Sequence, residues 1–103
     1  MNLLFICSRN QWRSRTAETI FRKSKEHSVK SAGTAVSARV KINQKLIDWA
    51  NLIFVMEQKH QEILMERFDC KEKEIIVLDI PDHFHYMDTE LVKELEETVP
   101  FYL

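Results

Sequence analysis

Glycine and proline are scarce in this chain of 103 residues. There is one glycine, there are two prolines, and no stretch is repeated or of low complexity. Linkers between domains are rich in glycine, serine or proline, so this composition excludes a chain divided into several domains. A hydrophobic content of 45% over this length is enough to bury one core. We therefore expect a single domain that spans residues 1–103.

Long apolar runs are also missing. No span approaches the roughly 20 apolar residues of a transmembrane helix. The apolar start at residues 1–6 is too short for a signal peptide and has no basic leader. The only two cysteines, Cys7 and Cys70, then indicate reduced thiols rather than a disulfide framework, with Cys70 structural or incidental. These features predict a cytoplasmic protein that makes no contact with a membrane.

What the sequence does contain is an alternation of strand and helix patterns. Because strands that alternate with helices favour a parallel sheet covered on both faces, we expect a three-layer α/β/α fold with a four-stranded parallel sheet. Ligands in this architecture bind beyond the carboxyl ends of the strands. The strands are predicted at 3–7, 29–32, 52–56 and 75–78, and the helices at 14–27, 43–50, 58–68 and 89–99.

The most specific motif follows the first predicted strand. Cys7 stands at the strand end, and Arg13 comes after five intervening residues, where a helix begins. Backbone amides at a helix start bind anions, and the same positive surroundings hold a cysteine as the thiolate that attacks. Arg13 is able to bind two phosphate oxygens through its planar guanidinium. Ser14 is expected to cap the helix. A cysteine at a strand end is more often a small buried hydrophobic residue, but strand, loop and helix fall here in the order that catalysis requires.

The run from Phe5 to Glu18 resembles the signature of the low-molecular-weight protein tyrosine phosphatases. Segments 31–34, 49–56 and 79–82 resemble, in the same order, that family's second strand, third strand and acid loop. The resemblance implies a phosphatase-I-like fold. It also implies hydrolysis of phosphate monoesters, with phosphotyrosine as the favoured substrate, through a cysteinyl-phosphate intermediate and without a metal or organic cofactor.

The resemblance further implies a role for each residue of the loop. Cys7 would be the nucleophile, Arg13 would stabilise the phosphoryl oxygens, and Ser14 would donate to the thiolate. Asn10 and Ser31 would hold the loop in shape around the phosphate. The expected phosphate-binding set is completed by Ser8, Arg9, Gln11 and Trp12.

Hydrolysis also needs an acid to protonate the leaving oxygen. Asp82 occupies the position of the family's catalytic aspartate and is the first candidate. Asp79, at the end of the fourth predicted strand, is the competing candidate, although it is equally able to be a structural cap. The family usually has proline where this chain has His83, so the loop is expected to be looser or shaped for another substrate.

Two aromatic side chains follow in the same loop. We expect Phe84 and Tyr86, with Trp12, to form the walls that hold an aryl phosphate, although Trp12 is equally compatible with a place in the core. His83 and His85 lie among aspartates and suggest zinc, but structural zinc sites have four ligands in paired clusters. We therefore expect no metal site in this loop or elsewhere in the chain.

Charge is divided unevenly along the chain. Residues 1–51 hold ten Lys and Arg against three Asp and Glu, a net +7, whereas residues 52–103 hold five against thirteen, a net −8. Arg9, Arg13 and Arg15 cluster at the proposed loop, and Arg39 and Lys41 lie after the second strand. This distribution is either an ordinary solvated surface or a rim that steers a polyanionic substrate. A phosphorylated protein, a small aryl phosphate and a phosphorylated nucleic-acid end all fit, and the oligomeric state stays open.

Departures from the family pattern keep other functions open. Arg9 replaces a common glycine, Trp12 replaces a frequent second cysteine, and the chain is shorter than typical members, which implies a more open site. A non-catalytic phosphate-binding or phosphoprotein-binding protein derived from a phosphatase is the main alternative. Arsenate reductases of this fold need two additional cysteines, whereas only Cys70 is available. Sugar-uptake phosphocarriers lack an arginine at the position of Arg13. We favour catalysis because every group that the chemistry needs is present.

Overall fold

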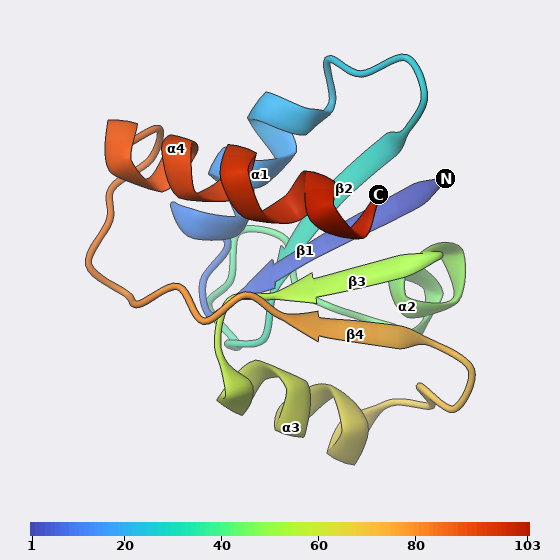
Figure 1. Ribbon diagram of the computed structural model, residues 1–103. Helices are drawn as coiled ribbons and strands as arrows, with labels where there is room; N and C mark the ends of the chain where they lie inside the picture. Colours follow the sequence, from blue (N-terminus) through green and yellow to red (C-terminus); the bar gives the residue numbers. More distant parts are fainter.

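The computed structural model describes all 103 residues. Its centre is a four-stranded, fully parallel sheet with the strand order β2-β1-β3-β4 (Figure 1). The strands are β1 (Asn2–Cys7), β2 (Ser28–Gly33), β3 (Leu52–Val55) and β4 (Glu74–Val77). The helices are α1 (Arg13–Phe21), α2 (Gln44–Trp49), α3 (Gln58–Arg67) and α4 (Thr89–Thr98), and a 3-10 turn η1 (Val99–Tyr102) ends the chain.

Helices cover both faces of the sheet, which confirms the predicted three-layer architecture. In Figure 1, α1 and α4 lie on one side of the sheet and α3 on the other. Side chains alternate along β1, so Leu3 and Phe5 join the apolar cluster that includes residues of α1 and α4, whereas Leu4 and Ile6 join the cluster that includes residues of α2 and α3. Phe5 stacks on Phe54 of β3, with ring centroids 5.0 Å apart. Burial on both faces explains why β1 and β3 are apolar at almost every position.

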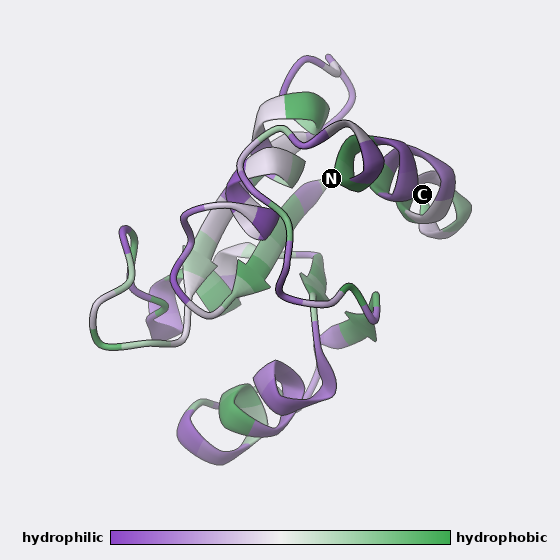
Figure 2. Ribbon diagram, turned by 90° about the vertical axis from the view of Figure 1, so that its left-hand side faces the viewer, coloured by the Kyte–Doolittle hydropathy of each residue, from purple (hydrophilic) through white to green (hydrophobic).

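Hydropathy follows these layers in the structure. Figure 2 shows hydrophobic residues concentrated in the strands in the middle of the molecule, and helices in which hydrophilic and hydrophobic residues are mixed. None of the helices has the length and apolar character needed to cross a membrane.

The element boundaries agree with the sequence predictions to within one residue, except at α1. This helix ends at Phe21, six residues before the predicted end. Phe21 stacks on Phe5 at 5.6 Å, and it is the last apolar residue before β2 begins. With no apolar side chain to pack on the sheet, residues 22–27 turn back toward the start of β2 instead of extending the helix.

The strand order places a crevice at one edge of the sheet. The chain runs from β1 outward to β2 and then returns to β3 on the other side of β1. Ile6 pairs with Val55, so β1 and β3 end side by side. Ligands bind in parallel sheets where the strand order reverses in this way. Residues that follow β1 and β3 therefore share one site.

Candidate active site

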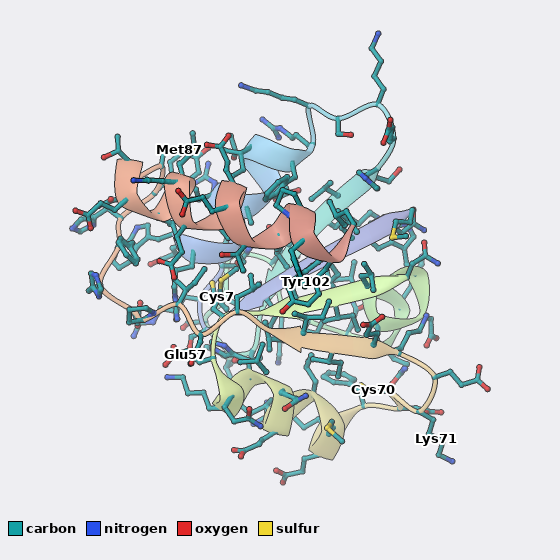
Figure 3. All side chains as sticks on the ribbon, viewed as in Figure 1. Cys7, Glu57, Cys70, Lys71, Met87 and Tyr102 are labelled. Carbon is teal, nitrogen blue, oxygen red and sulfur yellow. The ribbon has the colours of Figure 1, made fainter.

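The loop between β1 and α1 encloses a pocket with Cys7 among its lining residues. Cys7 is only 3% exposed, and it lies at the end of the sheet where Glu57 also lies, opposite Cys70 and Lys71 (Figure 3). The pocket has a volume of about 160 Å³. This is below the roughly 300 Å³ at which sites for drug-sized ligands begin, so the pocket fits a small anionic group. Its lining consists of Cys7, Ser8, Arg9, Gln11, Trp12, Arg13 and Asp82.

Two polar groups point at the sulfur of Cys7. The backbone N–H of Asn10 donates to Cys7 Sγ at 3.3 Å, and Ser14 Oγ lies 2.9 Å from the same sulfur. Ser14 Oγ also accepts a hydrogen bond from Asn10 Nδ2 at 2.8 Å. Besides the sulfur, the acceptor within reach of the Ser14 hydroxyl proton is the carbonyl of Ala32, 3.4 Å away. The serine proton is therefore best directed at Cys7, so both contacts place a donor against the sulfur.

Asn10 is the residue that fixes the shape of the loop. Its φ of 57° lies in the left-handed region, which asparagine tolerates better than most residues. Its Nδ2 donates to Ser14 and to Ser31 Oγ, each at 2.8 Å, and Ser31 in turn donates to Glu18 at 2.6 Å. Asn10 and Ser31 are buried behind the loop and do not line the pocket. They support the loop from behind the pocket.

The segment after β2 supports the same loop through its backbone. The N–H groups of Thr34, Ala35 and Arg39 donate to the carbonyls of Cys7, Ser8 and Arg9, at 3.0, 2.8 and 2.9 Å. In addition, Arg39 Nε donates to the carbonyl of Asn10 at 3.2 Å. These hydrogen bonds tie the carbonyls of residues 7–10 to the segment that follows β2. Arg39 thus supports the loop, while Lys41 forms an isolated bridge with Gly33.

Arg13 is buried and held in one orientation. Its Nη1 donates to Glu57 Oε2 at 2.6 Å and to the carbonyl of Ile80 at 2.8 Å, while Nη2 lies 3.6 Å from Asp82 Oδ1. The side chain is 2% exposed. With Nη1 anchored on two fixed acceptors, the other edge of the guanidinium is free to bind a ligand oxygen.

Glu57 is ionised by this contact. Burial by itself opposes its charge, but the hydrogen bond and positive charge of Arg13, helped by Lys59 and His60, outweigh burial and lower the pKa of Glu57. The pair therefore stays charged at neutral pH.

His60 is a fully buried polar residue beside the pocket. Its Nδ1 accepts from the backbone N–H of Glu57 at 3.0 Å, and its Nε2 lies 3.0 Å from Ser8 Oγ. Burial, with the neighbouring charge of Arg13, lowers the pKa of His60 from 6.5 to about 4. The ring is consequently neutral at neutral pH.

Of the three aromatic side chains predicted to form the walls of the pocket, only one lines it. Phe84 is 5% exposed and packs in the core against α4 residues, so it is not a wall of the pocket. Tyr86 lies on α1 instead, where its hydroxyl meets Thr19 at 2.7 Å and its ring covers Arg15. Trp12 is 40% exposed and does line the pocket.

The expected cap of α1 is also wrong. Trp12 occupies the cap position and makes no side-chain cap bond. Ser14 is instead buried inside the helix, because its hydroxyl is engaged with Cys7 and Asn10.

The structure separates the two candidate acids. Asp82 lines the pocket and faces Arg13, whereas Asp79 is exposed, has a φ of 61° and is not among the lining residues. His83 and His85 are exposed in the same loop, and no three His, Cys, Asp or Glu side chains come close enough to hold a metal ion. Of the acidic residues in this region, Asp82 has the position that a general acid needs.

The sequence placed Glu57 after the third strand, at the edge of the sheet where ligands are expected, but it assigned no role to Glu57. His60, on the first turn of α3, was not predicted at all. Nothing in the sequence indicated that His60, on a helix, would reach a loop 52 residues earlier.

Comparison with known proteins agrees with this geometry. Residues 2–48, from β1 through most of α2, match the sequence profile of the low molecular weight phosphotyrosine protein phosphatase family. The YwlE arginine phosphatase from Geobacillus stearothermophilus has the same fold, with a TM-score of 0.77 and 22% identity over 98% of this chain and 92% of that chain. The N-terminal part of the chain is therefore similar in sequence to this phosphatase family, and the whole chain has the fold of these solved structures.

Two tyrosine phosphatases have the same fold across nearly the whole chain. The tyrosine phosphatase Wzb from Escherichia coli K30, solved with phosphate, gives a TM-score of 0.76 and 21% identity over 98% of this chain and 94% of that chain. A protein tyrosine phosphatase from Entamoeba histolytica gives 0.73 and 19% identity over 93% of this chain and 88% of that one. A search of curated proteins found no match. The family profile stops at residue 48, so it does not reach Glu57, His60 or Asp82.

Proposed function

We propose that this protein is a low molecular weight phosphatase that hydrolyses phosphate monoesters with Cys7 as nucleophile, and that phosphotyrosine is its favoured substrate class. The observation that supports this most directly is the convergence on one small pocket of Cys7, Arg13 and Asp82. These groups supply a nucleophile, a cation for the transferred phosphoryl group and a proton.

The first step transfers the phosphoryl group to sulfur. The Cys7 thiolate attacks phosphorus in line, an S–P bond forms, and the P–O bond to the leaving group breaks. The leaving oxygen takes its proton from Asp82. Backbone amides of the loop and Arg13 Nη2 stabilise charge on the equatorial oxygens.

The second step releases phosphate. Asp82, now a carboxylate, accepts a proton from water as that water attacks phosphorus, and the S–P bond breaks to restore the thiolate. Ser14 Oγ, 2.9 Å from the sulfur, donates to the departing thiolate. Asp82 is 57% exposed, so water reaches it from solvent.

An aryl substrate is favoured by the shape of the site. Cys7 is almost fully buried, so a phosphoryl group must reach inward, and the exposed part of Trp12 offers a surface for a ring. Trp12 is itself braced edge-on by His85, with ring centroids 5.1 Å apart. A phosphorylated protein is the substrate that we propose. Because both cysteines are free and the nucleophile must stay reduced, we place the protein in the cytoplasm.

The test is hydrolysis of a small aryl phosphate by the full chain, with reductant present. Cys7→Ser is expected to abolish turnover, and Asp82→Asn to lower kcat by about 10²–10⁴. Asp79→Asn is the matched control and should leave kcat unchanged, because asparagine tolerates the same left-handed backbone. Folded wild-type protein that binds phosphate but hydrolyses no more than Cys7→Ser would contradict catalysis and favour the phosphate-binding alternative.

A further inference from the structure

The contact between Ser8 and His60 has no role in the two chemical steps above. Ser8 lines the pocket and comes directly after Cys7. His60 is completely buried on the first turn of α3, and the hydrogen bonds of its ring are to Ser8 Oγ and the backbone N–H of Glu57. A buried imidazole with both ring nitrogens engaged is held in a fixed position.

The tautomer of this ring follows from its partners. The backbone N–H of Glu57 is only a donor, so Nδ1 of His60 must be the acceptor in that bond. In the neutral ring the proton is then on Nε2, which donates to Ser8 Oγ. Because the oxygen of Ser8 accepts from His60, the hydroxyl proton of Ser8 is left for an acceptor on the pocket side.

This arrangement excludes a serine nucleophile. A histidine that activates serine needs a free lone pair toward the hydroxyl, whereas Nε2 carries a proton here. The low pKa of His60, about 4, keeps this neutral form across the neutral range. Ser8 is therefore a hydrogen-bond donor toward the pocket.

We propose that Ser8 is an additional donor to the phosphoryl group bound over Cys7, and that His60 is a positioning residue that fixes the direction of this hydroxyl. The proposal rests on the proposed function for the location of the phosphoryl group. It adds a side-chain donor to the backbone amides and Arg13. It also explains why a histidine is buried beside the pocket on α3, a helix that contributes no side chain to the pocket lining.

Two substitutions separate the two contacts of the imidazole. In His60→Asn, the amide oxygen lies near the position of Nδ1 and still accepts from Glu57, but the side chain is too short to reach Ser8. In His60→Gln, the amide nitrogen lies near the position of Nε2 and still donates to Ser8. Ser8→Ala removes the proposed donor itself. Each variant is made in the full chain, and affinity for inorganic phosphate is measured by calorimetry near pH 7.

Removing a hydrogen bond to a charged group lowers binding affinity by about tenfold or more. We expect Ser8→Ala and His60→Asn each to weaken phosphate binding by about this factor, and His60→Gln to stay within about threefold of wild type. The double variant Ser8→Ala/His60→Asn should bind no more weakly than Ser8→Ala, because His60 acts through Ser8. His27→Gln, at the opposite end of the sheet near Met1, is the matched control and should not change binding.

Other outcomes overturn the proposal. Unchanged binding by Ser8→Ala would show that the hydroxyl does not meet the phosphoryl group. An equal loss from His60→Asn in the wild-type and Ser8→Ala backgrounds would show that His60 acts through Glu57 and Arg13 instead. Wild-type protein that binds no phosphate would overturn both this proposal and the proposed function.

The binding measurement is independent of turnover, so a wild type that binds phosphate but does not hydrolyse it would contradict only the proposed function. If His60→Asn does not fold, ¹⁵N NMR of the wild-type imidazole gives a second test. The expected spectrum shows a proton on Nε2, and a ring protonated on Nδ1 would contradict the proposal.

Discussion

At the scale of single residues, the orientation of Arg13 depends on Glu57. Glu57→Gln keeps the size of the side chain but removes the charge that Arg13 meets at 2.6 Å. We expect a loss of about 1–3 kcal/mol in the free energy of unfolding, because a buried guanidinium loses its partner. We also expect kcat/KM for an aryl phosphate to fall about tenfold, since Arg13 is no longer held.

Urea unfolding and steady-state kinetics measure the two effects. Glu62→Gln, which removes an exposed carboxylate from the same helix, is the control and should change neither quantity. A Glu57→Gln variant as stable and active as wild type would refute the role of Glu57.

His60 gives the protein a second residue-level property, a dependence of stability on pH. The unfolded chain binds a proton on this histidine near pH 6.5, whereas the folded chain does so only near 4. Between these values the unfolded state holds more protons, so stability is complete above about 6.5 and is lost as the pH falls toward 4. The loss is on the order of 3 kcal/mol.

Urea titrations at a series of pH values test this. In His60→Gln the decline between pH 6.5 and about 4 should become shallower, whereas His27→Gln should retain the wild-type slope. Equal slopes in His60→Gln and wild type would mean that the imidazole does not titrate as described. Glu57, whose pKa is lowered, adds a loss only below its ordinary value of 4.5.

At the scale of elements, the end of β2 supports the loop between β1 and α1, and the single glycine of the chain is at this junction. A Cβ on Gly33 would lie 2.5 Å from the carbonyl oxygen of Ser8 and 2.7 Å from Ala38 Cβ. Gly33→Ala must therefore displace the backbone of the loop. We expect a destabilisation of about 1–3 kcal/mol and a fall in kcat, because the loop amides move away from the phosphoryl oxygens.

Thermal unfolding and aryl phosphate kinetics measure these changes. Val36→Ala, in the same segment but 84% exposed, is the control and is expected to stay within about 0.5 kcal/mol of wild type. Wild-type kinetics in Gly33→Ala would show that the loop tolerates the shift.

At the scale of the whole molecule, charge is separated between the two halves of the chain. Arg15, Arg22 and Lys30 line a groove between α1 and β2 together with Arg39, which also contacts the catalytic loop. We expect kcat/KM for a phosphopeptide with acidic flanks to fall with added salt more steeply than kcat/KM for a small aryl phosphate. Salt screens long-range attraction, with a Debye length of about 10 Å at 0.1 M.

Kinetics at increasing ionic strength check this expectation. Arg22→Gln/Lys30→Gln should flatten the salt dependence of the peptide reaction, whereas Lys71→Gln, at the other end of the sheet, should not (Figure 3). Parallel salt dependences for both substrates would mean that the groove is an ordinary solvated surface.

The sequence by itself determined the elements and the local part of the site. The strand, the loop and the helix start from β1 to α1 follow each other within a few residues. The spacing of Cys7 and Arg13 was therefore enough to predict that both side chains line one pocket. Asn10 was also predictable, since its tolerance of positive φ is intrinsic to the residue. The continuous apolar runs of the strands predicted a sheet buried on both faces.

Only the tertiary structure decided which distant residues complete the site. Arg13 meets Glu57 and the carbonyl of Ile80 across separations of 44 and 67 residues, and Ser8 meets His60 across 52. These pairs form because parallel strands bring their carboxyl ends to one edge, which no local pattern specifies. The same packing placed Phe84 in the core rather than in the pocket, since its ring is buried in the apolar cluster that includes Leu91 and Leu95 of α4.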